Sequence, residues 1–448
     1  MSSVRTRVVL TIALVGAGAL TPAATRAVAA SSPPIPYGTM WTVDTANDTL
    51  RAFSVGASGA SVPLAVVSGA STGLDAPSDV AVDQAGHVFA TNSGNDSITE
   101  YAATADGDAT PALMIQGPQT GLDGPSSITI DEFHYGIHAL PGNRDFEYLV
   151  VSNADGNSIE AFDATNGGDA LPAHSIQGPK TDLDHPMAIA LSRFGEPMVV
   201  NNPETGKPTI TSYESFGNHK PIFELAPRAP HRLKDPTGLA VIDDLRFLVT
   251  DAGRDSVTEF SYFPGLPRST DLLPNRVVHG ADTGIVDPSD LSLTADGRIA
   301  VTNASDGSVR TFASDARGDE RPLSILSSPA GTAGSAVYGV PPKHPTDLRV
   351  RLRGHHARLR WTAPTATGGG LEGYYADVLP RSWFGSGTHP VKHANRFAPI
   401  VTTTADHLKI GHLTPGHTYV AISEAVNAFG YSASAPPVTF KVPKRQVR

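Results

Sequence analysis

The sequence contains no cysteine among its 448 residues. This absence excludes disulfide bonds, thiol catalysis, cysteine-ligated zinc and a cysteine-linked lipid anchor. Beyond residue 30 there is also no apolar run long enough to cross a membrane, for which about 20 consecutive residues are needed. We therefore expect a protein with no transmembrane segment, long enough to bury a stable core without covalent cross-links.

The first thirty residues have the pattern of a cleaved signal peptide. Arg5 and Arg7 form a basic start, Val8–Leu20 is apolar, and Ala27–Ala29 fits the rule of small residues at a cleavage site. A retained membrane anchor is the alternative, but the apolar segment is short for a bilayer. We therefore predict residues 1–30 to be a signal peptide and the mature protein to be secreted, either extracellular or associated with the cell wall.

Charge is divided unevenly along the chain. Residues 31–340 hold 17 Lys and Arg against 39 Asp and Glu, whereas residues 341–448 hold 14 Lys and Arg against 5 Asp and Glu. The acidic part is expected to repel nucleic acid and attract cations. The basic part could favour anionic surfaces such as cell-wall polymers, and two ordinary solvated surfaces are the alternative.

One sequence pattern recurs along most of the chain. Each copy opens on a proline, continues with alternating apolar residues, turns into a second apolar run that ends in Asn or Asp, and closes a third run on an aromatic residue. A short fourth apolar run follows, so each copy predicts a four-stranded antiparallel sheet. Five copies begin at Leu74, Leu122, Leu183, Leu233 and Ile285, and a half copy covers Met40–Phe53.

Repeated four-stranded units of about 50 residues favour a β-propeller, because closing the sheets into a ring hides their edges and apolar faces. The half copy supplies strands two to four of the first blade. We predict that Ser335–Val340 returns to supply its missing inner strand. The fold class expected for residues 31–340 is thus all-β, a six-bladed propeller closed by both ends of the domain.

The repeats resemble the NHL family of propellers, in the form found in secreted bacterial proteins. The resemblance rests on Gly69–Val82 (GASTGLDAPSDVAV), on Gly117–Ile128 and on Asn157–Ile159. It implies the propeller fold over residues 40–340. It leaves function open, because such propellers serve as binding platforms, as scaffolds and, in some cases, as lyases or lactonases.

The pattern changes after residue 340. Trp361 stands before Thr-Ala-Pro, Leu413–Tyr419 reads LTPGHTY, and Asn427–Ser432 reads NAFGYS. These segments resemble a fibronectin type III domain, a β-sandwich, which we place at residues 341–443 with a basic tail at 444–448. The resemblance implies that Trp361 packs in the core and that Tyr419 occupies the tyrosine corner. Such domains mostly space, bind or present.

The polar residue that ends the second strand of each copy is the first candidate for chemistry. Asn and Asp supply hard oxygen ligands, and a ring of them could bind calcium. The same residue types also cap turns through backbone hydrogen bonds, and a repeat needs the same turn in every copy. The structural interpretation is therefore favoured for Asp44, Asn92, Asn153, Asn201, Asp251 and Asn303.

The second candidate is a position whose residue type differs among the copies of the repeat. The third residue of each predicted inner strand is Asp79, Ser127, Ala188, Gly238 or Asp290, and this position should lie at the mouth of the central channel. Asp79 and Asp290 fall in the two blades beside the first, so with Asp44 they could form a metal site, for Ca²⁺ in particular. A solvated pair of carboxylates is the alternative.

The third candidate is a long turn in the third blade, between Asp131 and Tyr148. Long loops on a compact scaffold often bind ligands, although a tolerated insertion is the alternative. This possible binding loop contains His134, Tyr135, His138 and Arg144.

These observations favour a secreted, non-enzymatic binding or scaffold protein. We expect it to be a monomer, and Ca²⁺ is the one cofactor that the sequence suggests. The propeller face would bind a protein or carbohydrate at the cell surface, and the fibronectin-like domain would present it. The resemblance leaves open a metal-dependent hydrolase or lyase, similar to propeller lactonases, with a cation at the channel mouth. A purely structural envelope protein is the third hypothesis.

Overall fold

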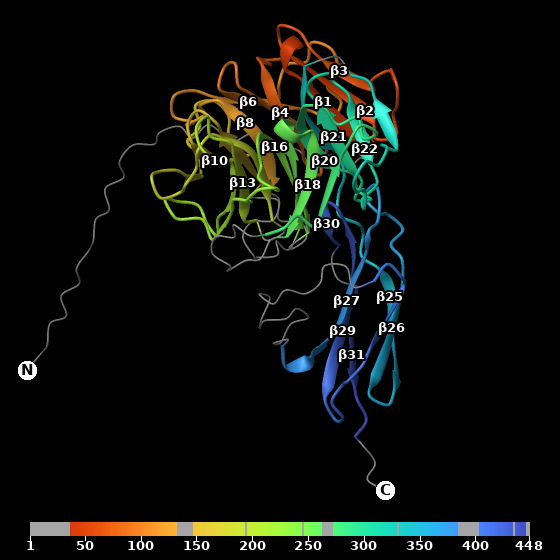
Figure 1. Cartoon of the computed structure of the whole chain (residues 1–448). Coiled ribbons are helices and arrows are strands. Elements are labelled where there is room, and N and C mark those ends of the chain that lie inside the picture. Colours follow the sequence, from red (N-terminus) through yellow and green to blue (C-terminus); the bar gives the residue numbers. More distant parts are fainter. Residues whose placement is uncertain are drawn as a thin grey trace, which may run out of the picture. The chain divides into compact units, whose positions relative to one another are not determined.

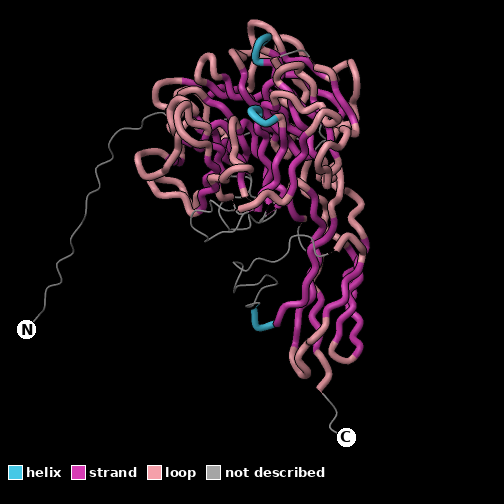
Figure 2. Tube along the Cα trace, in the orientation of Figure 1, coloured by secondary structure: helices cyan, strands magenta, loops and turns pink. Residues whose placement is uncertain are grey.

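The computed structural model describes residues 36–131, 147–192, 195–243, 246–261, 272–328, 331–383, 403–432 and 435–444. The predicted signal peptide lies outside this part. Strands dominate the described residues, and the helical turns are the short 3-10 segments η1 (Thr45–Asn47), η2 (Ala252–Arg254) and η3 (Arg381–Trp383), as Figure 2 shows. Within these residues, no helix is long and apolar enough to cross a membrane.

Each copy of the sequence repeat forms one four-stranded antiparallel sheet (Figure 1). The second sheet is β4 (Pro77–Val82), β5 (Val88–Asn92), β6 (Ser97–Tyr101) and β7 (Leu113–Gln116). The third is β8 (Pro125–Asp131), β9 (Tyr148–Asn153), β10 (Ser158–Asp163) and β11 (His174–Ile176). The fourth is β12 (Pro186–Leu191), β13 (Pro197–Asn201), β14 (Thr209–Ser212) and β15 (Phe223–Leu225). The fifth is β16 (Pro236–Asp243), β17 (Arg246–Asp251), β18 (Ser256–Ser261) and β19 (Arg276–His279). The sixth is β20 (Pro288–Leu293), β21 (Ile299–Asn303), β22 (Val309–Phe312) and β23 (Ser324–Leu326).

The first sheet joins the two ends of this region. Its strands β1 (Thr39–Asp44), β2 (Thr49–Ser54) and β3 (Ala65–Val67) come from the half copy, and β24 (Thr332–Val337) pairs with β1. The prediction of a returning strand is confirmed, although the strand begins three residues earlier than Ser335 and ends at Val337. The inner strands β24, β4, β8, β12, β16 and β20 then contact one another in a closed cycle, which is a propeller-like arrangement.

The core of this ring is divided among the spaces between neighbouring sheets. In β9, Leu149 and Val151 face an apolar cluster shared with the second sheet, and Val150 faces a cluster shared with the fourth. Successive strand residues point to opposite faces, so a strand with apolar neighbours on both sides reads as a continuous apolar run. Equivalent clusters fill the other spaces, including the one between the sixth and first sheets.

The C-terminal region consists of two sheets that share one core. A three-stranded sheet contains β25 (Thr346–Arg353), β26 (His356–Thr362) and β28 (His407–Ile410). The second contains β27 (Gly373–Pro380), β29 (Thr418–Asn427), β30 (Gly430–Tyr431) and β31 (Val438–Lys441). Trp361 is buried in the shared core with its ring 5.2 Å from that of Tyr374. The hydroxyl of Tyr419 accepts a hydrogen bond from the amide of Thr414 at 3.0 Å.

Candidate functional site

The polar residues predicted from the repeat lie where the inner strands begin. In each sheet, the first residue of the inner strand is paired with the Asn or Asp that ends the second strand. These pairs are Pro77 with Asn92, Pro125 with Asn153, Pro186 with Asn201, Pro236 with Asp251, Pro288 with Asn303 and Thr332 with Asp44. All six Asn and Asp side chains are buried.

Five of these side chains hold the loop that leads into the inner strand of their own sheet. Asn92 Oδ1 accepts a hydrogen bond from the amide of Asp75 at 3.3 Å, and Asp251 Oδ1 accepts one from Asp235 at 3.0 Å. The structural interpretation is therefore confirmed for these positions, because their oxygens bind backbone amides. The equivalent bonds are Asn153 to Asp123, Asn201 to Asp184 and Asn303 to Val286.

Asp44 differs from the other five. Its carboxylate is 1% exposed and lies 2.7 Å from the guanidinium of Arg51, and it also accepts hydrogen bonds from Asn47. These contacts hold it within the first sheet. Among the residues that the structure describes, no group of three or more His, Asp or Glu side chains is arranged to hold a metal ion. The structure thus brings together two of the three predicted carboxylates, Asp79 and Asp290, and places Asp44 in an ion pair.

Asp79 and Asp290 lie beside a narrow space at the centre of the ring. The space measures about 20 Å³ and is lined by the second and third residues of the inner strands. One of these residues is Gly334 on β24, the strand that lies between β4 with Asp79 and β20 with Asp290. A space of this size has room for about one water molecule. A side chain at Gly334 would place its Cβ 2.7 Å from Asp79 Oδ1, so glycine is needed where the strands converge.

Each axial carboxylate reaches from its own sheet to the next. Asp79 accepts hydrogen bonds from the hydroxyl of Ser127 at 2.8 Å and the amide of Ile128 at 2.9 Å, both on β8. Asp290 accepts one from the amide of Ser335 on β24 at 2.9 Å. The two side chains play the same structural role at different points of the ring. Both residues are partly exposed as well as bonded to protein groups, so the choice between a metal site and a solvated pair of carboxylates stays a prediction.

The two carboxylates also influence each other's ionisation. Burial raises the pKa of Asp79 to about 6, against the hydrogen bonds that favour its ionised form. Burial and the nearby charge of Asp79 raise the pKa of Asp290 well above its ordinary value. Two carboxylates this close do not both ionise readily, so we expect the pair to lose its protons in two separate steps.

A set of hydroxyl groups around the same space was not among the residues predicted from the sequence. The residue after the opening proline is often Ser or Thr, and its hydroxyl donates to the carbonyl of the first residue of the next inner strand. The pattern Pro-Ser or Pro-Thr in four copies was the signal. The bonds are Ser78 to Pro125 at 2.6 Å, Ser126 to Pro186 at 2.7 Å, Thr237 to Pro288 at 2.6 Å and Ser289 to Thr332 at 3.4 Å.

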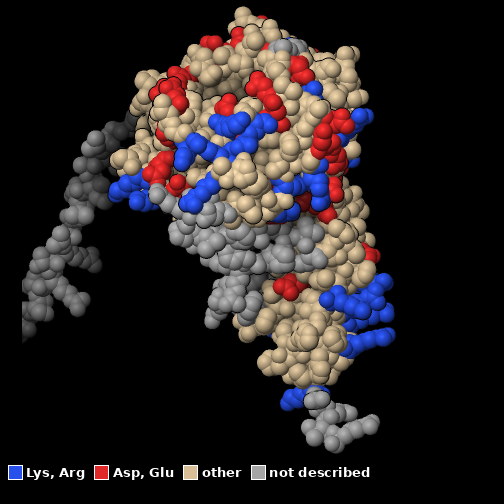
Figure 3. All heavy atoms as spheres, in the orientation of Figure 1, with Lys and Arg blue, Asp and Glu red and all other residues tan. Residues whose placement is uncertain are grey.

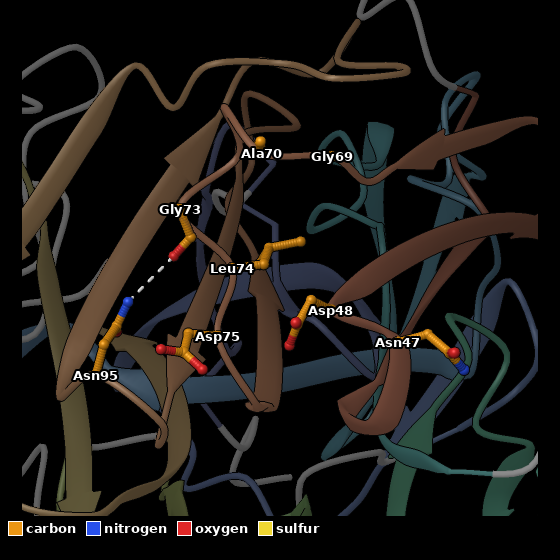
Figure 4. A pocket seen from close by; sticks show the side chains of 8 residues that line it. All are labelled: Asn47, Asp48, Gly69, Ala70, Gly73, Leu74, Asp75 and Asn95. Carbon is orange, nitrogen blue, oxygen red and sulfur yellow. Dashed lines mark hydrogen bonds between the residues drawn. The ribbon is translucent and has the colours of Figure 1, made fainter.

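An open pocket of about 410 Å³ lies between the first and second sheets (Figure 4). The end of η1 contributes Asn47, and Asp48 follows it. The loop before β4 contributes Asp75, and Asn95 comes from the turn after β5. Asp48 Oδ1 accepts a hydrogen bond from the amide of Ala76 at 2.8 Å, which fixes this side of the pocket. The side chain of Asp75 is exposed, and its carboxylate can bind a ligand's hydroxyl or amino groups.

The possible binding loop of the third copy runs between Asp131 and Tyr148. His134, Tyr135, His138 and Arg144 all lie outside the described residues. Their role as a possible binding loop stays a prediction.

Several solved structures of low sequence identity are similar to parts of this chain. No family model and no curated protein sequence matches the chain. It is similar to a solved protein of unknown function from Bacteroides caccae, with 10% identity, 67% of this chain and 98% of that chain covered, and a TM-score of 0.45. It is also similar to the WD40 β-propeller domain of Doa1, with 13% identity, 72% of this chain and 86% of that chain covered, and a TM-score of 0.41. A human fibronectin type III domain is 18% identical, with 25% of this chain and 86% of that chain covered, and a TM-score of 0.20. None of these similarities carries an argument about function.

Proposed function

We propose that the protein is a secreted, non-enzymatic binding protein. In this proposal residues 31–340 form a six-bladed NHL-type propeller whose face binds a protein or carbohydrate at the cell surface. Residues 341–443 form a fibronectin type III domain that presents the propeller or associates it with that surface. The mature protein acts outside the cell as a monomer.

The observation that carries this proposal is the use of the polar residues at the ring's centre. Asp79 and Asp290 hold the next inner strand, and Asn92 holds the loop before its own. Polar side chains committed in this way build a rigid support. Loops on a rigid support can vary in sequence without loss of the fold, which is the usual arrangement of binding surfaces.

The pocket between the first two sheets supplies a place for the ligand. Its volume of about 410 Å³ is within the usual range for small-ligand sites, and the exposed carboxylates of Asp48 and Asp75 line it. These groups suit the hydroxyls of a sugar or the amino groups of a protein side chain. The pocket is therefore the part of the face that we expect to contact the ligand.

The proposal can be tested by binding of the mature protein to panels of extracellular glycans and cell-surface proteins. Asp75→Ala should weaken the interaction at least tenfold, because it removes an exposed carboxylate from the pocket lining. Asp123→Ala is the matched control, since Asp123 is exposed at the equivalent position of the next copy. Equal binding by the two variants would place the ligand elsewhere, and no binding to either panel would refute the function.

A hydrolase or lyase is the second candidate, because carboxylates with raised pKa values often occur at catalytic centres. The residues do not fit a calcium ion well. Calcium takes six to eight oxygen ligands, whereas the centre offers two carboxylates that already bind backbone amides, and Asp44 pairs with Arg51. Calorimetric titration of the mature protein with CaCl₂ tests the point directly. Saturable binding that Asp79→Ala abolishes would favour the enzyme.

A further inference from the structure

One face of the three-stranded C-terminal sheet carries an array of positive charge. Along β26, Ala357, Leu359 and Trp361 are buried, whereas His356, Arg358 and Arg360 alternate with them and are exposed. The same alternation on β25, together with one position on β28, completes the face. Its cationic residues, the basic array, are Arg349, Arg351, Arg353, Arg358, Arg360 and Lys409.

The register of the strands places these charges directly opposite one another. Arg349 is paired with Arg360, and Arg351 with Arg358, which in turn is paired with Lys409. Side chains opposite each other on neighbouring strands are about 5 Å apart at Cβ, and like charges at that separation are unfavourable. The array therefore reduces the stability of the sheet, and folding alone does not account for it.

Acidic neighbours neutralise little of this charge. Among the described residues, Arg349, Arg351, Arg353, Arg358 and Lys409 form no ion pair with Asp or Glu. Asp406 lies at one end of the array. There it contacts His407 at 3.0 Å, and the charge of Arg360 contributes to lowering its pKa, after the larger effect of the His407 hydrogen bond. Most of the array is thus available to an external anion.

Protection of sheet edges explains only part of the pattern. Lys and Arg on edge strands prevent pairing with other chains, and both β25 and β28 are at edges. However, β26 is the central strand, and it carries Arg358 and Arg360 on the same face. Its two edges are already paired, so its arginines need another explanation.

Figure 3 shows Lys and Arg gathered over β25 and β26. The described acidic residues of this region are few, and residues 31–340 carry the excess of Asp and Glu. Basic charge is therefore concentrated on a small surface of an otherwise acidic protein. Such a concentration attracts an anion toward one defined face.

We propose that the basic array binds a linear polysaccharide that carries carboxylate or sulfate groups. Five of its six cationic residues are arginines, whose planar guanidinium donates paired hydrogen bonds to carboxylate or sulfate-like oxyanions. Residues two apart on a strand lie roughly 6.7 Å from each other. The array thus offers several rows of donors to a chain with regularly repeated anionic groups.

Two other polyanionic partners fit this face less well. Single-stranded nucleic acid binding relies on exposed aromatic rings for base stacking, and the outward residues of β25, β26 and β28 include no Phe, Tyr or Trp. Membrane-surface binding combines basic residues with exposed apolar ones. The large apolar side chains that are exposed in the described residues all precede residue 326.

This inference rests on the proposed surface-associating role of the C-terminal domain and specifies its ligand. The test uses the whole mature protein and measures its affinity for heparin and for polygalacturonate at low salt, with neutral dextran as a negative control. We expect binding that weakens as NaCl rises. The variant Arg351→Gln/Arg358→Gln/Arg360→Gln should bind both polymers at least tenfold more weakly. Its melting temperature should not fall, because like-charge pairs are removed.

The matched control is Arg232→Gln/Arg317→Gln/Arg321→Gln, which removes the same charge from exposed positions in the ring and should change affinity less than twofold. Equal weakening by the two variants would mean that net charge, not the array, drives binding. Tighter binding to duplex DNA or to phosphatidylglycerol vesicles than to either polysaccharide would also overturn the proposal. If the protein binds a ligand at the pocket but binds no polymer, the proposed function is retained and the proposal for the basic array is refuted. If it binds the polymers but no ligand at the pocket, the proposal for the basic array is retained and the pocket assignment is refuted.

Discussion

The carboxylate of Asp290 accepts a hydrogen bond from the backbone amide of Ser335 at 2.9 Å, and so links the sixth sheet to the strand that completes the first. Asp79 makes the same kind of bond to the amide of Ile128. Both acids therefore hold neighbouring inner strands together, and both do so with pKa values that burial has raised. A substitution that keeps the hydrogen bond and removes the charge can separate the stabilising contact of each acid from the unfavourable burial of its charge.

Asp290→Asn should make stability less dependent on pH. An acid whose pKa is raised in the folded state binds its proton more tightly there than when unfolded, so its contribution to stability falls as pH rises above about 4. Asparagine keeps an oxygen for Ser335 and carries no charge. We expect the variant to be more stable than the wild type at pH 8, and similar to it at pH 4.

Chemical denaturation at both pH values measures this difference. Asp315→Asn is the control, because Asp315 is exposed on the ring, and it should have no comparable effect. A less stable Asp290→Asn protein at pH 8 would show that the ionised carboxylate is stabilising and that our assignment of the pKa shift is wrong.

Gly334→Ala should destabilise the ring. The new Cβ would lie 2.7 Å from Asp79 Oδ1 and 3.2 Å from Asp79 Cα, where the inner strands converge. Overpacking of this kind costs about 1–3 kcal/mol, which thermal unfolding detects. Gly56→Ala is the matched control, since its Cβ would meet no atom within 4 Å. Equal melting temperatures for the two variants would argue against close packing at the axis.

Ser126→Ala should also reduce stability, by about 1 kcal/mol, because the carbonyl of Pro186 loses its 2.7 Å hydrogen bond. Urea denaturation of this variant and of Ser215→Ala, which changes an exposed serine, gives the comparison. If both variants unfold at the same urea concentration, the hydroxyl bonds between sheets contribute nothing measurable.

Arg351→Glu should stabilise the C-terminal region while it weakens polymer binding. The substitution places a carboxylate opposite Arg358 and replaces repulsion with attraction, an effect of roughly 0.2–1 kcal/mol. A rise in melting temperature at low salt that disappears at high salt is the expected result. Arg317→Glu, with the same change in charge on the ring, should show no gain. A destabilised Arg351→Glu protein would indicate that the arginine has a packing role.

Much of the fold could be predicted because the repeat fixes the order of the strands. The second strand of each copy is continuously apolar, and Leu149, Val150 and Val151 show why, since their side chains alternate between two different clusters. The returning strand could be predicted because the half copy lacks an inner strand. Its bounds could not, because Thr332–Val337 has none of the opening residues of the other copies and is defined by its pairing with β1.

The candidate site was less predictable, because its chemistry depends on side-chain partners that the repeat pattern does not specify. Asp44 looks equivalent to Asn92 in the repeat, but Arg51, seven residues away, takes its carboxylate. The proximity of Asp79 and Asp290 could be inferred from their positions in the ring, whereas their bonds to Ile128 and Ser335 could not. The basic residues were visible as composition, and only the register of β25, β26 and β28 shows that they oppose one another.

The pairing of β1 with β24 also sets the order in which the protein can mature. Met40 lies opposite Val337, so the inner edge of the first sheet has no native partner until almost the whole ring has been synthesised. Contacts between such distant residues form slowly, and unpaired strand edges favour aggregation. During synthesis, the amino-terminal strands must therefore be kept from premature association until the closing strand arrives.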